Sequence, residues 1–308
     1  MNALNKCKEA LSQSTYLLQR DCIDSEAEVI VQSAYRFTTG KKLSRLELYS
    51  IPNHEFTEEI LSHIQSLTKS RACGVPLQHL TGVQSFFEHE YEINSDALIP
   101  RPETEILVQE VILNQTNPML GLELGLGSGI ISIELLHHFP QLKMLASELS
   151  VKAAELATRN AERILGKGGN QAGRLEIISI AEAYFVLEPF QKILVEKKAD
   201  LIVSNPPYLA KNDEIEEEVL NHEPHCALFP PTDSANNEDA LFFYRKIARQ
   251  AVALLSFSGM IYLEIPSTRA AQIESLFLKE GWLVEIKKDL SSRERVLIAK
   301  RNPRRNYG

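Results

Sequence analysis

The spacing of apolar residues changes near residue 80. Before that point, apolar side chains recur every three or four positions, which predicts amphipathic helices. The first such series is Leu4, Cys7, Leu11 and Leu18. A second helix is predicted to begin at a capping sequence at Ser25 and to end at Gly40, and a third to begin at Asn53. Residues 1–80 are therefore expected to form a small helical domain. Residues 81–97, which alternate in part between polar and apolar, are expected to form a β-hairpin linker.

Residues 98–308 show a different pattern, in which short apolar runs with β-branched members alternate with helical periods. Such runs are typical of buried parallel strands, and their alternation with helices predicts a mostly parallel, three-layer α/β sheet. After the run that precedes Gly125, the predicted strands are 142–148, 175–180, 201–203, 260–264, 282–287 and 295–300. The acidic stretch 211–221 is predicted to be a solvated helix.

Composition places the chain among ordinary globular proteins. Hydrophobic residues make up 44% and charged residues 24% of its 308 residues. No apolar run approaches the ~20 residues that span a bilayer, and the N-terminus lacks the apolar segment of a signal peptide. The four cysteines show no Cys-x-x-Cys spacing, which argues against a zinc site or a disulfide framework. We therefore expect a reduced, cytoplasmic protein without a metal site or membrane contact.

The net charge of −8 is unevenly distributed. Residues 1–80 contain nine basic and nine acidic side chains, whereas the rest of the chain contains 24 basic and 32 acidic ones. Nonspecific affinity for nucleic acids comes from clustered Lys and Arg. The acidic balance of residues 81–308 therefore makes a nucleic-acid substrate less expected.

A short turn after the run 201–203 combines hydrogen-bond acceptors with an aromatic ring. Pro206 and Pro207 end the strand because neither can donate to a sheet ladder. The chain thus leaves the sheet at the carboxyl end of a strand, where ligands of open α/β sheets bind. The prolines remove two backbone donors and leave carbonyl acceptors, while Asn205 adds a side-chain acceptor and Tyr208 a flat ring. This combination suits a planar NH2 group, although an ordinary proline-rich turn fits the same spacing.

A glycine cluster forms the second notable turn. An apolar strand runs into Gly125-x-Gly127-x-Gly129, and an apolar helix follows. Glycines let a ligand lie close to the main chain, but a tight turn without a ligand has the same appearance. Dinucleotide enzymes use Gly-x-Gly-x-x-Gly, so the shorter spacing here argues against a dinucleotide site. Glu148 lies about 20 residues further on, where a carboxylate accepts hydrogen bonds from ribose hydroxyls in doubly wound folds.

The turn 205–208 resembles the Asn-Pro-Pro-Tyr motif of amino-group methyltransferases that use S-adenosylmethionine. The segments 98–105 (Leu-Ile-Pro-Arg-Pro-Glu-Thr-Glu) and 222–228 (His-Glu-Pro-His-Cys-Ala-Leu) resemble the protein-(glutamine-N5) methyltransferases of peptide release factors, the HemK/PrmC family. The similarity extends from about residue 76 to the end, with a weaker helical match before it. It implies a seven-stranded methyltransferase sheet over residues 98–308, with the last strand antiparallel, and a substrate-recognition role for residues 1–80.

The resemblance also implies the site residues. The catalytic group comprises Asn205, Pro206, Pro207 and Tyr208. The cofactor, S-adenosylmethionine, is expected to contact Glu123, Gly125, Leu126, Gly127, Ser128, Gly129, Glu148, Glu182 and Asn205, with no metal. The family mostly has Asp where this chain has Glu123 and Glu148, and Gly where it has Pro266. These departures leave the class unchanged, but their effect on cofactor affinity does not follow from the sequence.

The implied reaction is methyl transfer to the side-chain amide nitrogen of a glutamine in a protein, with the Gly-Gly-Gln of release factors as the expected target and a monomeric enzyme. Three alternatives remain open at this point. The first is methylation of the amino group of a nucleic-acid base, which would need a path for an extruded base and a basic groove. The second is methylation of a ribosomal protein, and the third is a non-catalytic binding protein that has kept the fold and lost its affinity for the cofactor. The helical domain could grip the substrate or merely cover the catalytic domain.

Overall fold

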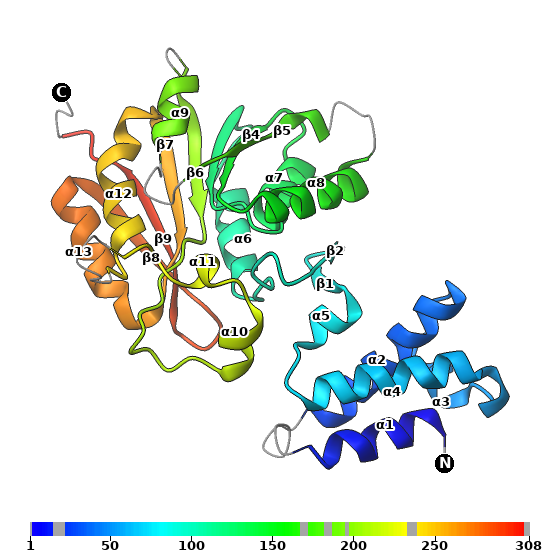
Figure 1. The fold of residues 1–308 in the computed structure, drawn as a ribbon. Helices are drawn as coiled ribbons and strands as arrows, with labels where there is room; N and C mark the ends of the chain where they lie inside the picture. The colour runs from blue at the N-terminus through cyan, green and yellow to red at the C-terminus, as the bar shows by residue number, and fades with distance from the viewer. Residues whose placement is uncertain are drawn as a thin grey trace. The chain divides into compact units, whose positions relative to one another are not determined.

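The chain folds into two compact units (Figure 1). The computed structural model describes residues 2–14, 22–166, 172–181, 187–194, 197–232 and 239–304, so the predicted positions Leu18 and Glu182 lie outside the described residues. One unit comprises residues 1–83 and 215–222, and the other comprises residues 84–214 and 223–308. We call them the helical unit and the sheet unit. None of the described helices is both long and apolar enough to cross a membrane.

The helical unit confirms a helical N-terminal region. Its helices are α1 Ala3–Ser12, α2 Ile23–Thr39, α3 Arg45–Ser50, α4 Glu58–Ala72, α5 Leu77–Thr81 and α10 Glu217–His222, with a 3₁₀ turn η1 at Asn53–Glu55. Helices α1, α2 and α4 pack around a core that includes Leu11, Ile30 and Ile60. Gly40 ends α2 in the left-handed conformation, as predicted, because it has no side chain to oppose a positive φ.

Three details of the helical prediction are wrong. Helix α2 begins at Ile23, so Ser25 lies inside it and its hydroxyl donates to the Cys22 carbonyl at 2.9 Å. Thr57, rather than Asn53, caps α4 by accepting from the Ile60 amide. Most residues of the stretch 211–221 are exposed, as predicted, but it is helical only in α10, and the Glu218 side chain is largely buried in an ion pair of the helical unit.

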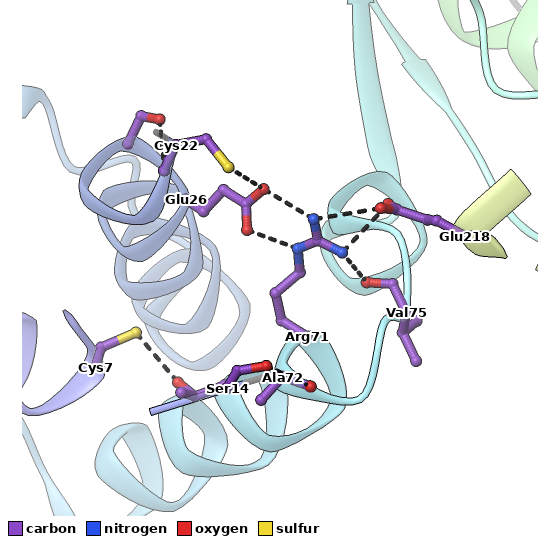
Figure 2. A network of polar contacts seen from close by, with 10 residues as sticks. Cys7, Ser14, Cys22, Glu26, Arg71, Ala72, Val75 and Glu218 are labelled. Carbon is purple, nitrogen blue, oxygen red and sulfur yellow. Dashed lines mark hydrogen bonds and ion pairs between the residues drawn. The ribbon is translucent and has the colours of Figure 1, made fainter. Parts of the chain in front are cut away.

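A buried arginine lies at the centre of the helical unit (Figure 2). Arg71 is on α4 and is only 1% exposed. Its Nε and Nη2 atoms donate to the two carboxylate oxygens of Glu26 on α2 at 2.6 and 2.9 Å. This bidentate geometry joins α2 to α4 by a pair of charge-assisted hydrogen bonds inside the protein.

The sheet unit has seven strands in the order β5-β4-β3-β6-β7-β9-β8. The last strand, β9, runs antiparallel to both of its neighbours, β7 and β8. The predicted fold class is therefore confirmed, because the apolar runs of the sequence coincide with the strands. These are β3 Leu120–Leu124, β4 Lys143–Glu148, β5 Leu175–Ser179, β6 Ala199–Ser204, β7 Leu255–Glu264, β8 Trp282–Lys288 and β9 Glu294–Arg301.

Helices cover both faces of this sheet (Figure 1). One face carries α6 Thr104–Asn114, α7 Ile130–His138 and α8 Val151–Leu165, and the other carries α9 Glu188–Ile193, α12 Phe242–Gln250 and α13 Ala270–Glu280. Neighbouring residues of β6 point to opposite faces of the sheet. Val203 therefore packs on the face covered by α6, α7 and α8, and Ile202 packs on the face covered by α9, α12 and α13. The shorter elements are α11 His225–Leu228 and the 3₁₀ turns η2 Ala172–Arg174, η3 Ala251–Ala253 and η4 Ser267–Arg269.

A two-stranded hairpin of β1 Val83–Phe86 and β2 His89–Glu92 precedes the sheet in the chain. Asn160 of α8 joins this hairpin to the glycine turn. Its Oδ1 accepts from the Glu92 amide at 2.7 Å, and its Nδ2 donates to the Ser128 carbonyl at 2.9 Å. Asn160 is fully buried, so these bonds hold the turn from behind, within the sheet unit.

Candidate active site

The strand order of the sheet reverses at β3. From β3 the chain proceeds through β4 to β5 on one side, and then returns to the other side of β3 with β6. Such a switch point leaves a crevice at the carboxyl ends of the strands, where ligands of open α/β sheets bind. A cavity lies at this place. Its lining includes Gly125, Leu126, Gly127, Ser128, Glu123, Glu148, Asn205, Pro206 and Pro207.

The glycine turn is anchored to β4 and open toward the cavity. The amides of Gly125 and Leu126 both donate to the Ser147 carbonyl, at 3.0 and 3.1 Å. Gly127 has a φ of +56°, and a Cβ placed there would meet no atom within 4 Å. The main chain at Gly127 therefore faces open space in which a ligand could contact it directly.

Gly129 differs from the other two glycines. A Cβ at this position would lie 3.0 Å from the Cβ of Ala157 on α8. Gly129 therefore permits the close packing of α7 on α8, and it is not among the described residues that line the cavity. Its predicted contact with the cofactor stays a prediction.

Glu148 closes one side of the cavity at the end of β4. Its Oε2 accepts from the Gly127 amide and its Oε1 from the Ser150 amide, both at 2.8 Å. Two backbone donors thus fix the plane of the carboxylate, and each oxygen keeps a lone pair for a further donor. This geometry leaves room for ligand hydroxyls to donate to the carboxylate, and the ribose contact expected of Glu148 stays a prediction.

Glu123, on β3, is fully buried at the floor of the cavity. Its Oε2 accepts from the amide and the hydroxyl of Ser132. Its Oε1 has no hydrogen-bond partner among the described residues, and burial raises the pKa of the carboxyl to about 8. A buried acceptor without a partner is costly. A ligand ammonium group at this point would supply the missing donor and favour the charged carboxylate.

The turn after β6 brings the four predicted catalytic residues together. The Ser204 hydroxyl donates to the Leu124 carbonyl at 2.6 Å and ties the end of β6 to the end of β3. Asn205, Pro206 and Pro207 line the main cavity and also a smaller cavity beside it. Tyr208 lines only the smaller cavity, together with the buried Glu264. Burial also raises the pKa of the Tyr208 hydroxyl, so the ring stays neutral.

The two segments that carry the family resemblance meet at Glu223. This residue is 4% exposed, and its Oε2 accepts from the Ile99 amide at 2.9 Å. Its Oε1 accepts from Arg101, which therefore pairs with Glu223 rather than with Glu103 or Glu105. The contact places both segments beside the cavity, where they contribute Leu98, Pro100, Arg101, Thr104, Pro224, Cys226 and Ala227 to the lining.

Several lining residues carried no signal in the sequence. Ile180, near the predicted contact Glu182, lines the cavity, whereas Glu182 itself lies outside the described residues. Ser147, Leu149, Ser150, Ala153 and Phe243 also line it. These are common residue types on ordinary strands, helices and loops, so only the folded sheet identifies them.

Comparison with known proteins gives two matching domain families and several long relatives. Residues 9–82 match the PrmC N-terminal domain, and residues 102–226 match the methyltransferase small domain. The release factor glutamine methyltransferase of Thermodesulfovibrio yellowstonii is 31% identical over 98% of this chain and 99% of its own. The chain belongs to the release factor glutamine methyltransferase family.

Other relatives of this family member differ in length or are more distant. A bifunctional methyltransferase of Rickettsia typhi is 32% identical over 92% of this chain, but the chain spans only 54% of that protein's length. Among solved structures, the hMettl16 catalytic domain aligns with a TM-score of 0.51 and 14% identity, over 79% of this chain and 84% of that one. The latter similarity concerns the fold alone.

Proposed function

We propose that this family member transfers a methyl group from S-adenosylmethionine to the side-chain amide nitrogen of a glutamine in a protein, namely the Gly-Gly-Gln glutamine of a peptide chain release factor. One observation carries the proposal. The Asn205 turn, whose acceptor groups would suit a planar NH2 group, lines the same cavity as the open glycine turn and the oriented Glu148 carboxylate.

The residues around the main cavity fit the cofactor. The main chain at Gly127 would lie against it, Glu148 would accept hydrogen bonds from its ribose hydroxyls, and the unpartnered oxygen of Glu123 would accept from its ammonium group. Both carboxylates are Glu where the family mostly has Asp. Here the Gly127 amide donates to Glu148 and the Ser132 amide donates to Glu123. When bound, S-adenosylmethionine supplies a methyl group bonded to a positively charged sulfur.

The acceptor amide needs to be oriented rather than deprotonated in advance. An amide nitrogen is a poor nucleophile because its lone pair is delocalised into the carbonyl. Asn205 Oδ1 and the Pro206 carbonyl would accept its two N–H groups and stabilise the positive charge that grows on nitrogen. As the bond to the methyl carbon forms, the nitrogen would release one of its two protons, and the product is the neutral N-methyl amide. Tyr208 would stack on the amide plane. Positioning and preorganised dipoles are then the main contributions to the rate.

The proposed partner is the release factor itself, bound in part by residues 1–80, with residues 81–97 as the linker to the catalytic domain 98–308. The match of residues 9–82 to the PrmC N-terminal domain supports this division. Relatives named release factor glutamine methyltransferase favour a release factor as the methyl acceptor over a nucleic-acid base or a ribosomal protein.

The most direct test is mass spectrometry of release factors and ribosomal proteins from cells with and without this enzyme. We expect the Gly-Gly-Gln peptide of a release factor to gain the mass of one methyl group only when the enzyme is present. Purified enzyme, release factor and S-adenosylmethionine should reproduce the change. Methylation found on a ribosomal-protein glutamine instead would replace the proposed substrate while keeping the reaction.

A variant of Glu148 tests the cofactor site. Glu148→Ala should lower the affinity for S-adenosylmethionine and S-adenosylhomocysteine together, because hydrogen bonds to a charged acceptor are worth ~1.5–3 kcal/mol each, less any replacement by water. Titration calorimetry measures both affinities. Glu176→Ala, which removes an exposed carboxylate from the neighbouring strand, is the control. A loss of less than about twofold on both ligands would exclude Glu148 as the ribose acceptor.

A further inference from the structure

A buried carboxyl group lies in the smaller cavity, beside the Asn205 turn. It belongs to Glu264, the last residue of β7, which pairs in parallel with β6. In the register of these strands Ser204 lies opposite Leu263, so Asn205 and Glu264 follow one position further along the two chains. Both residues line the smaller cavity. The carboxyl group therefore lies next to the turn that is proposed to hold the acceptor amide.

Two hydrogen bonds hold Glu264 in place within the sheet unit. The Thr104 hydroxyl, at the start of α6, donates to its Oε2 at 2.7 Å. The Tyr244 hydroxyl, on α12, donates to its backbone carbonyl at 2.8 Å. Glu264 is only 4% exposed, and its Oε1 accepts no hydrogen bond from the described residues. This oxygen keeps its lone pairs for a ligand in the cavity.

The carboxyl group of Glu264 ionises in the neutral range. Burial raises its pKa to about 7, although the hydrogen bond from Thr104 lowers it. The other titratable groups that face it are Glu103, Arg101, Arg295, Tyr208 and Tyr244. The glutamate raises the pKa further and the two arginines lower it, whereas both tyrosines stay neutral because burial raises their own pKa values.

Methylation of an amide yields a proton that the acceptor turn cannot keep. Asn205 Oδ1 and the Pro206 carbonyl accept hydrogen bonds, but neither oxygen is basic enough to hold a proton at neutral pH. Among the described residues that line the smaller cavity, the titratable ones are Arg101, Tyr208 and Glu264. An arginine and a buried tyrosine already carry their protons at this pH, so Glu264 is the one of the three that can take up another.

We propose that Glu264 is a further catalytic residue, which accepts the proton that the amide nitrogen releases during methyl transfer. The inference rests on the proposed function. The nitrogen bonds to the methyl carbon as the carbon–sulfur bond breaks, and the electron pair of that bond stays on sulfur. The nitrogen then gives one proton to the Glu264 carboxylate, while the electrons of the N–H bond return to nitrogen. The products are the neutral N-methyl amide and a protonated Glu264, which passes the proton to solvent when the products leave.

The rate of methyl transfer should follow the ionisation of Glu264. An ionised carboxylate stabilises the positive charge that develops on nitrogen and can accept the proton, whereas a protonated carboxyl can do neither. The single-turnover rate constant with a release factor should therefore rise about tenfold per pH unit below the pKa of the carboxyl and level off above it.

Glu264→Gln is the test variant, because it keeps the size of the side chain and an acceptor for Thr104 but cannot ionise. On the high-pH plateau its single-turnover rate should be roughly a hundred- to ten-thousand-fold below that of the wild type, and it should not vary with pH. The affinity for S-adenosylmethionine should not change, since Glu264 is not among the described residues that line the main cavity. A merely structural role for Glu264 would not abolish the pH dependence.

Glu103→Gln is the matched control. It removes one negative charge close to Glu264, but Glu103 is not among the described lining residues of either cavity. Its plateau rate should equal that of the wild type. The midpoint of its pH profile should move to lower pH, because Glu103 raises the pKa of Glu264. Thr104→Val should move the midpoint the other way, because the lost hydrogen bond lowers that pKa.

A second measurement needs no substrate. Carbon-13 NMR of the labelled full-length protein can follow the Glu264 carboxyl, whose signal is the one missing in Glu264→Gln. We expect it to titrate in the neutral range, and a carboxyl still protonated at about pH 9 would overturn the proposal. Transfer by Glu264→Gln with the wild-type rate and pH profile would overturn it while the proposed function stands. A wild-type enzyme that methylates no release factor at any pH would overturn both.

Discussion

Asn205→Ala should lower the rate of methyl transfer roughly a hundred- to a thousand-fold, which corresponds to about 2.7–4 kcal/mol, as for loss of one preorganised polar partner in other enzymes. The Asn205 oxygen would accept an N–H of the amide being methylated, and the value of that bond rises as positive charge develops on nitrogen. The loss should therefore appear in the chemical step and not in cofactor affinity. The side chain lines the cavity at the end of β6, beside the bond that joins Ser204 to β3.

The measurement is single-turnover methylation of a release factor that carries Gly-Gly-Gln, with the affinity for S-adenosylmethionine determined in parallel. Asn205→Asp is the matched variant, because it keeps an acceptor of similar shape, adds a charge and loses the amide donor. It should retain more activity than Asn205→Ala if acceptance dominates. Near wild-type transfer by a folded Asn205→Ala protein would contradict the mechanism and reduce the turn to a stiff connection.

The sheet could be predicted from the sequence because local features determine it. A buried strand of a parallel sheet must be apolar on both faces, so β6 appears in the sequence as a short continuous apolar run. Pro206 ends this run because a proline nitrogen carries no hydrogen to donate to the sheet. The glycine turn is equally local, since positive φ at Gly125 and Gly127 favours glycine. Both turns follow strands at the same edge of the sheet, which is why their meeting in one cavity was predictable.

Helix starts were less predictable, because the same residues serve as caps and as interior residues. Ser25 and Glu28 have the spacing of a capping box, but a cap also needs extended backbone at its first residue. Helix α2 has already begun two residues earlier, so the Ser25 hydroxyl donates backward to Cys22 and caps nothing. Spacing alone does not distinguish these two arrangements.

The stretch 211–221 illustrates a second limit of sequence reasoning. Charged residues at helical spacing in 211–221 are typical of a solvated face, and Arg71 near the end of α4 is typical of a surface cation. Arg71 and Glu218 pair although they lie 147 positions apart in the sequence, and nothing in the residues around either one predicts the pairing. Burial of a charge depends on long-range packing, which composition and periodicity do not report.

Arg71→Met should be the most destabilising single substitution considered for the helical unit. Removal of one partner of a buried ion pair typically costs about 3–5 kcal/mol, because the other charge stays buried without compensation. Here Glu26 would lose both of its hydrogen bonds from Arg71, and Glu218 would lose its ion pair with Arg71 as well. The loss should be confined to the helical unit, because the side-chain contacts described for Arg71 lie within it.

Hydrogen exchange of the full-length protein can measure this loss as the change in opening free energy of amides in α1, α2 and α4. Tryptophan fluorescence would miss it, because the single tryptophan, Trp282, lies in the sheet unit. Arg45→Met is the control: Arg45 pairs with Glu28 on the same helix α2, but its side chain is 75% exposed, so solvent screens the pair and the loss should be much smaller. In the double variant Arg71→Met/Glu26→Leu, only part of the stability should return, because two apolar side chains replace the Arg71–Glu26 pair while the Glu218 carboxylate still lacks Arg71. Equal losses for Arg71→Met and Arg45→Met would show that the buried pair contributes no more than a surface one.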